Sequence, residues 1–402
     1  MIKPYREAFN KHFTKEKYQA FLDSITKEFD YEPPFRIAET PVFIPKLLKE
    51  RLLEACQDIN EVLTAENFKE LTKEAIKLPE HVVPDEDYRS RFIQMDFGIC
   101  IDEEGNYIPQ LIELQGFPSL YFFQDLLLQT YEKSYDLPPR FSAHVDGLSR
   151  KEYKQMLLDE IIGDTDPKQV VLLEIEPEKQ VTYIDFLCAE RMLGLKVLCI
   201  SKMKKDGKRL YYLDEDGNEV TIRKIYNRVI FDELDKRPDL KREFYFKDKV
   251  DVEWVGHPNW FFRISKYTMP LLKSKYVPEC LYLDQLEIYP ENLDDYVLKP
   301  LYSFAGSGVK LHVTQEELNA IEDKSNFILQ KRVNYVPVVE TLDVPAKCEI
   351  RIMTLWNRKK GKAQVANNLV RLSKGEMVGV RYNKDKEWVG ATIGFFEDEP
   401  RY

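Results

Sequence analysis

The chain of 402 residues is longer than one ordinary domain, so two or three packed units are expected at roughly 150 residues per domain. Hydrophobic residues make up 44% of it and aromatic residues 12%, which is enough to build cores and excludes general disorder. The formal net charge of −10 argues against a general binder of nucleic acid or anionic membranes, because both need a basic face.

The first 130 residues are predicted to form helices and then a hairpin. Apolar residues recur at helical spacing up to about residue 78, and from residue 92 the period changes to two, which is typical of strands. The expected elements are helices at Lys15–Phe29, 44–63 and 68–76, paired strands at 92–101 and 107–114, and a helix at 120–130.

From residue 149 helices and strands alternate, an order that predicts a parallel, Rossmann-like layer with helices packed on it. A third pattern, mainly of strands, begins near Tyr296. The expected elements are strands at 170–175 and 197–200 around a helix at 181–193, a hairpin of 208–213 and 220–226, a helical stretch at 257–290, strands on both sides of a glycine loop near residue 306, a helix at 314–321, and strands at 327–331, 348–356 and 364–372.

Signals of export and of metal binding through histidine are weak. The N-terminal residues lack the apolar core of a signal peptide, and the longest apolar runs are too short for a membrane span. The six cysteines are scattered, and no two of the five histidines have metal-ligand spacing. We therefore expect a cytoplasmic protein with reduced core cysteines and without a histidine-built zinc site.

The segment 296–311 is the strongest candidate for chemistry. A strand delivers Lys299, a proline ends that strand, and a loop with Gly306, Ser307 and Gly308 follows. Glycines let backbone N–H groups approach phosphate oxygens, and Lys299 adds positive charge nearby. The loop is neither a Walker A loop nor a dinucleotide fingerprint, because a strand rather than a helix is expected after it. An ordinary hairpin is the alternative.

Charged residues on the later strands form a second signal. Alternation along 348–356 puts Glu349 and Arg351 on one face, and Arg371 lies on the next strand. Burying Lys299, Arg351 and Arg371 without an anion would be costly, which indicates an anionic ligand. The alternative is solvent-exposed charge on an open sheet.

In this order, the motifs Val-Leu-Lys-Pro (297–300), Gly-Ser-Gly-Val (306–309), Leu-Gln-Lys-Arg-Val (329–333) and Glu-Ile-Arg-Ile (349–352) resemble the ATP-grasp ligases. The resemblance implies that the strand 327–331 leads to the adenine site and that Arg351, Arg371 and Lys299 act on the transferred phosphoryl group. The residues it implies for ATP binding are Lys266, Lys299, Gly306, Ser307, Gly308, Gln330 and Lys331.

The position of the acidic hairpin resembles circularly permuted members of that family, such as glutathionylspermidine synthetase. Those proteins carry their metal ligands at the front of the chain, and by resemblance Asp96, Glu113 and Gln115 would bind Mg²⁺. Hard oxygen ligands on one face of a hairpin suit this ion. Gln115 stands where the family has Asn and reaches one methylene farther. An amphipathic hairpin with one wet face is the alternative.

The resemblance implies an α+β (α/β) chain with a circularly permuted ATP-grasp fold, a Rossmann-like pre-ATP-grasp domain and an N-terminal helical segment. The expected units are a helical segment at 1–90, a metal-binding hairpin at 91–148, the Rossmann-like domain at 149–290, and the nucleotide-binding region at 291–402.

The expected activity is that of an ATP-dependent C–N ligase, which joins a carboxylate to an amine through an acyl phosphate and releases ADP and phosphate. ATP and Mg²⁺ are the expected cofactors, and the partners are small-molecule carboxylate and amine substrates rather than nucleic acid or a membrane. Two alternatives stay open: a catalytically silent ATP-binding protein of the same fold, favoured by Gln115, and a small-molecule phosphotransferase.

Arginine forks match carboxylates, so arginines outside these motifs are candidates for binding an acidic substrate. These residues, for which a surface position is the alternative, are Arg89, Arg91, Arg228 and Arg381.

Overall fold

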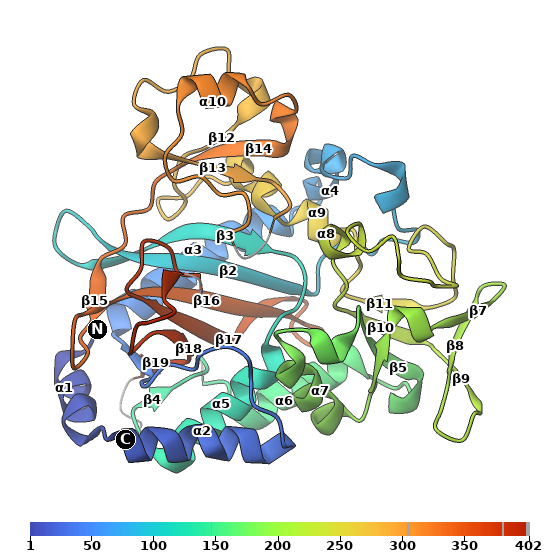
Figure 1. The fold of residues 1–402 in the computed structure, drawn as a ribbon, viewed down its shortest axis with the longest axis horizontal. Coiled ribbons are helices and arrows are strands. Elements are labelled where there is room, and N and C mark those ends of the chain that lie inside the picture. Colours follow the sequence, from blue (N-terminus) through green and yellow to red (C-terminus); the bar gives the residue numbers. More distant parts are fainter. Residues whose placement is uncertain (146, 304–305, 380–381, 399–402) are drawn as a thin grey trace.

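A computed structural model describes residues 1–145, 147–303, 306–379 and 382–398, and shows a mixture of helices and sheets (Figure 1). This is the α+β class that the sequence predicts. No helix in these ranges is both long and apolar enough to cross a bilayer. The six cysteines are free thiols, five of them buried and Cys199 half-buried.

The central sheet joins the beginning of the chain to its end. Its strand order is β18-β17-β16-β2-β3, with β15 paired beside β16. The strands are β2 (Phe92–Ile101), β3 (Tyr107–Gln115), β15 (Pro337–Val339), β16 (Ala346–Asn357), β17 (Lys362–Ser373) and β18 (Gly390–Thr392). Because β16 lies antiparallel to β2, Arg351 stands opposite Asp96, and Asp96 in turn stands opposite Glu113.

One face of this sheet is apolar and the other is polar. Ile93, Met95 and Phe97 of β2 belong to a buried core that also contains Leu48 and Leu52 of α3 (Lys46–Leu63). Strand side chains alternate, so Gln94 and Asp96 point to the opposite face. The period-two pattern of the sequence therefore separates the core of the central sheet from its polar face.

A four-stranded parallel sheet forms the second layer (green to yellow in Figure 1), with the order β11-β10-β5-β6. Its strands are β5 (Val170–Glu174), β6 (Lys196–Cys199), β10 (Lys224–Asn227) and β11 (Glu253–Val255). Val170 and Leu172 belong to one core and Val171 and Leu173 to another, so both faces are buried. A strand covered on both faces reads as a continuous apolar run, as this one does.

Helices accompany these layers, most of them near the expected positions. Their bounds are α1 (Lys3–His12), α2 (Lys15–Phe29), α4 (Phe68–Leu71), α5 (Tyr121–Ser134), α6 (Arg150–Ile161), α7 (Tyr183–Leu193), α8 (Phe231–Leu234), α9 (Trp260–Arg263) and α10 (Gln315–Asn319).

The small lobe at the top of Figure 1 holds the sheet β12-β14-β13. Its strands are β12 (Cys280–Tyr282), β13 (Tyr296–Pro300) and β14 (Phe327–Lys331). The strand β14, expected to lead to the adenine site, is the central strand of this sheet, and the Lys331 N–H donates to Glu279 O at 2.8 Å. The strand expected after the glycine loop is reduced to one bridge, between Leu298 and Lys310.

Besides its helices, the N-terminal segment contributes a strand that pairs with the end of the chain. It contains β1 (Val42–Ile44), which pairs in parallel with β19 (Gly394–Glu397), and β19 pairs on its other side with β4 (Phe141–Ser142). The first 50 residues are thus bound to the last described residues of the chain.

Two further predictions were wrong. The stretch 257–290 is not mainly helical; it holds one turn of α-helix, a 3₁₀ segment at Lys266–Leu271 and β12. Pro270 lacks the N–H that a continuing helix needs. The expected strand 220–226 is split: β9 (Glu219–Thr221) pairs with β8 (Arg209–Leu213) beside β7 (Lys204–Asp206), whereas β10 joins the parallel sheet.

Candidate functional site

An ion cluster lies on the polar face of the central sheet. Asp96 is 1% exposed and is held by the fork of Arg351, with Nε to Oδ1 at 2.6 Å and Nη2 to Oδ2 at 2.7 Å. Arg371 donates to the same Oδ2 and also pairs with Glu349, which it faces across β16 and β17. Charges from residues 96 and 371 therefore meet at one point of the fold.

The pKa values follow from this pairing. Burial would raise the pKa of Asp96, but Arg351 and Arg371 outweigh it and hold the pKa below its ordinary value. Burial raises the pKa of Glu349, which Arg371 only partly offsets. Tyr335 donates to Glu349 at 2.7 Å, and burial together with that carboxylate raises the pKa of its hydroxyl well above 10. The cluster is thus a neutralised network, with Tyr335 protonated.

Gly98 makes room for Tyr335. It stands opposite Glu349 in the register of β2 and β16, and a Cβ at this position would come within 2.8 Å of the Tyr335 ring. A side chain here would push the ring away from Glu349.

Two buried lysines approach the cluster from the small lobe and its neighbouring turn. Lys299, 7% exposed, is the penultimate residue of β13 and donates to Ile112 O at 2.9 Å. Lys266, 5% exposed, lies 3.4 Å from Glu113 Oε2 and donates to Ser303 O at 2.5 Å. The structure thus brings both lysines to Glu113, at the point where the glycine loop begins.

The lysines and Glu113 shift one another's pKa values. Burial lowers the pKa of Lys299 to about 8, although Glu113 partly opposes this. Burial would raise the pKa of Glu113, but Lys266, with help from Arg371 and Lys299, brings it below its ordinary value. Because burial makes the Lys299 ammonium group lose its proton easily, an additional anion nearby would stabilise its charged form.

The glycine loop starts beside Lys266, which donates to Ser303 O. Gly306 and Gly308 both have φ of +71°, a conformation that favours glycine, and Ser307 is exposed. A Cβ on Gly306 would lie 3.1 Å from Met377 Cε, so the loop extends from the small lobe to the segment after β17.

The remaining residues expected to bind ATP are divided. Gln330, 1% exposed, donates to Leu111 O at 2.8 Å and so lies against β3 beside the cluster. Its Oε1 is buried without a hydrogen-bond partner among the described residues. Lys331 is exposed on the small lobe.

Asp96, one of the residues expected to bind Mg²⁺, is paired with arginines in the structure. Both of its oxygens accept hydrogen bonds from guanidinium groups, so it is a partner of the arginines rather than a free ligand. Across the described part of the chain, no group of three or more His, Cys, Asp or Glu side chains is placed to hold a metal ion. The anion that neutralises Arg351 is thus Asp96 of the same chain.

Glu113 and Gln115 remain as oxygen donors. They line a cavity of about 10 Å³, which is room for roughly one water molecule. Mg²⁺ is commonly bound through one or two carboxylates together with substrate phosphates; Glu113, which pairs with Lys266, and Gln115 are the residues that would hold it here.

Gln94 is a member of the site that the sequence reading missed. Its Oε1 accepts from Arg351 Nη1 at 3.0 Å and from Gln115 Nε2 at 2.6 Å, and its own amide donates to Ser119 O at 2.5 Å. It links the cluster to the loop that follows β3. Gln94 lies two residues before Asp96 on the same face of the strand, and this spacing could have identified it from the sequence.

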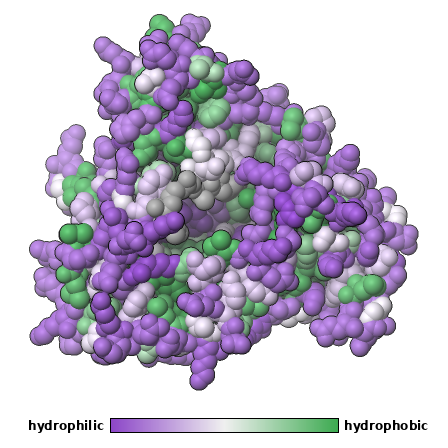
Figure 2. Space-filling view, viewed as in Figure 1, coloured by the Kyte–Doolittle hydropathy of each residue, from purple (hydrophilic) through white to green (hydrophobic). Residues whose placement is uncertain are grey.

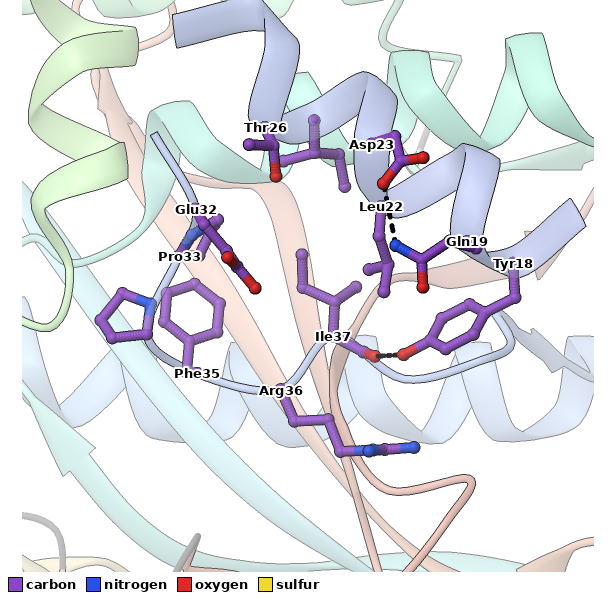
Figure 3. Close-up of a pocket in the computed structure, with 12 residues that line it drawn as sticks. Tyr18, Gln19, Leu22, Asp23, Thr26, Glu32, Pro33, Phe35, Arg36 and Ile37 are labelled. Atoms are coloured by element: carbon purple, nitrogen blue, oxygen red, sulfur yellow. Dashed lines mark hydrogen bonds between the residues drawn. The ribbon is translucent and has the colours of Figure 1, made fainter. Parts of the chain in front are cut away.

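Figure 2 shows a hollow with hydrophilic residues near the middle of the face in view, below the small lobe. A cavity of about 620 Å³ lies elsewhere, between α2 and residues 32–37 (Figure 3). There the Tyr18 hydroxyl donates to Ile37 O and Gln19 donates to Asp23, so those polar groups satisfy one another.

The arginines considered for an acidic substrate lie apart. Arg89 and Arg91 line a cavity at the far end of β16. Arg228 follows β10 and is buried, with Nη2 3.5 Å from Thr182 Oγ1. Arg381 lies outside the described residues.

Comparison with known proteins places the fold. No protein-family model matches the chain, and no curated protein matches it. Among solved structures, the chain is similar to a glutathione synthetase-like effector (GSS30) from Globodera pallida in its apo form, with a TM-score of 0.58. The match covers 95% of this chain and 96% of that chain at 11% sequence identity. The chain therefore has a glutathione synthetase-like fold.

Proposed function

We propose that this chain binds ATP over the polar face of the central sheet and is an ATP-dependent carboxylate–amine ligase of the circularly permuted ATP-grasp type. The observation that carries the proposal is the meeting of Lys299 and Lys266, both buried, with Glu113 at the start of a glycine loop. The glutathione synthetase-like fold, shared over nearly the whole of both chains, supports it.

The roles follow from the contacts. Lys299 and Lys266 neutralise phosphate oxygens, and the backbone of Gly306, Ser307 and Gly308 supplies N–H donors. Arg371, whose side chain is 34% exposed, stands at the open side of the cluster and stabilises charge that develops on a transferred phosphoryl group. Arg351 positions Asp96 and Gln94 beneath it.

Mg²⁺ held by Glu113 and Gln115 would neutralise charge on the phosphates. In this proposal the acidic hairpin, the parallel layer and the C-terminal strands correspond to the permuted metal hairpin, the pre-ATP-grasp domain and the nucleotide-binding region. A carboxylate activated as its acyl phosphate is attacked by the amine, with release of phosphate. No covalent side-chain nucleophile is needed.

The test is ADP and phosphate release by the full chain with Mg-ATP and pools of amino acids, peptides and polyamines. Lys299→Ala and Glu113→Gln are expected to abolish ADP production. Glu103→Gln, an exposed position in the turn of the same hairpin, is the matched control and is expected to keep full activity. Retention of most activity in Lys299→Ala or Glu113→Gln would contradict the proposal.

Two observations favour a second function, that of a catalytically silent ATP-binding protein. Asp96 is neutralised by two arginines, and Gln115 is turned with its amide nitrogen toward Gln94. In that case Mg-ATP raises the melting temperature of the protein, since a ligand that binds only the folded state stabilises it, while no acceptor supports turnover.

A further inference from the structure

A cavity of about 400 Å³ lies at the far end of β16, away from the ion cluster. Trp356 on its wall is five residues along β16 from Arg351, which corresponds to roughly 17 Å at the usual rise of a strand. This volume suits a small molecule. None of the residues proposed to bind ATP lines it.

Arg89 in this cavity is a cation without an acidic partner. Its guanidinium carbon lies 3.4 Å from the ring centroid of Trp356 and 4.1 Å from that of Tyr88. Among the described residues it makes no hydrogen bond and no ion pair beyond these ring contacts. Arg89 is half-buried; burial lowers its pKa, and the nearby carboxylates of Glu160 and Asp87 only partly offset this.

The neighbouring arginines are already paired. Arg91 Nη1 lies 2.9 Å from Glu253 and 3.4 Å from Glu160, and Arg358 Nε lies 2.8 Å from Glu160. The guanidinium groups that line the cavity are those of Arg89, Arg91 and Arg358, and Glu253 pairs with the last two. Among the described residues, Arg89 is the arginine of these three that no carboxylate pairs with.

We propose that Arg89 binds the oxyanion of a small molecule, a carboxylate or a phosphate group, at a site separate from the ATP site. The rings of Tyr88 and Trp356 both lie against the planar guanidinium group and limit its rotation. Its in-plane N–H donors are left for two oxygens of one anion. The paired Arg91 and Arg358 hold the walls of the cavity in place.

The test is side-chain NMR of the full chain labelled with ¹⁵N-arginine, titrated separately with inorganic phosphate and with acetate. The Nε–H resonance of Arg89, identified by its loss in Arg89→Gln, is expected to shift and saturate with at least one anion. The arm that saturates at lower concentration identifies phosphate or carboxylate as the ligand chemistry. Shifts confined to Arg351 and Arg371 would place the anion at the ion cluster and overturn this inference without touching the proposed ATP site.

Two conservative variants, Trp356→Phe and Arg89→Lys, and one control variant keep the test independent of folding defects. Trp356→Phe retains Arg89 but weakens its clamp and is expected to weaken binding, whereas Arg209→Gln, an exposed arginine paired with Glu219, leaves it unchanged. Arg89→Lys keeps the charge without the fork and is expected to bind about tenfold more weakly. An anion affinity in Arg89→Lys and Trp356→Phe equal to that of the unmodified chain would refute the site.

Discussion

Replacement of Arg351 by Met tests the buried ion pair on which the site is built. The substitution leaves Asp96, 1% exposed, without the fork that satisfies both of its oxygens. Breaking a buried pair by removing one partner costs about 3–5 kcal/mol. Arg371 still contacts Asp96 from the partly exposed side, so we expect a loss of about 3 kcal/mol, near the lower end of that range.

Urea denaturation of the full chain measures this loss, and the double variant Asp96→Asn/Arg351→Met isolates the pair. Because the double variant buries no unpaired charge, its loss is expected to be about 2 kcal/mol smaller than the sum of the single losses. Arg209→Met, which breaks an exposed pair with Glu219, is the matched control and is expected to have little effect. The reasoning would be refuted if Arg351→Met lost as little stability as Arg209→Met. It would also be refuted if the losses of Asp96→Asn and Arg351→Met simply added in the double variant.

Three further predictions concern the same face of the sheet. The pKa of Lys299 is about 8, so the affinity for ATP is expected to fall as the pH rises above 8, and Lys299→Arg is expected to flatten this profile in a titration series. The unfolded chain keeps the Lys299 proton up to about pH 10.5, whereas the folded chain loses it near pH 8. The contribution of Lys299 to stability therefore rises with pH between about 8 and 10.5. Lys299→Met is expected to remove that rise from urea denaturation series. Gly98→Ala is expected to cost about 1–3 kcal/mol of stability, because the new Cβ meets the ring of Tyr335. Adding Tyr335→Leu to this variant should recover part of the loss. An unchanged unfolding midpoint in Gly98→Ala would contradict the close contact.

Strong periodicity made parts of the fold readable from the sequence. The bounds of β2 and α2 match their predictions because alternation and helical spacing there are nearly unbroken, and a Thr14 cap begins α2. The parallel layer was also foreseeable, because helices and short apolar strands alternate. The site residues Lys299 and Arg351 were found for a similar reason, since each is a charge set inside an apolar strand.

Pairing between distant segments was not readable. β1 has three residues, and nothing local indicates that it pairs with β19 at the other end of the chain. Likewise, alternation put Arg351 on a face but could not show that Asp96 stands opposite it, since that depends on the register of β16 against β2. An anion was expected beside Arg351, and the fold supplies it from its own hairpin.

Calorimetric titration with Mg-ATP tests the central claim, that the buried lysines beside Glu113 form a triphosphate site. The full chain is expected to bind ATP with one site, and Lys299→Met is expected to weaken binding by about tenfold or more, since a charge-assisted contact is lost. Lys208→Met, at an exposed position in a distant turn, is the control and is expected to bind as the unmodified chain does. No binding by the unmodified chain, or equal affinity in Lys299→Met, would contradict the account.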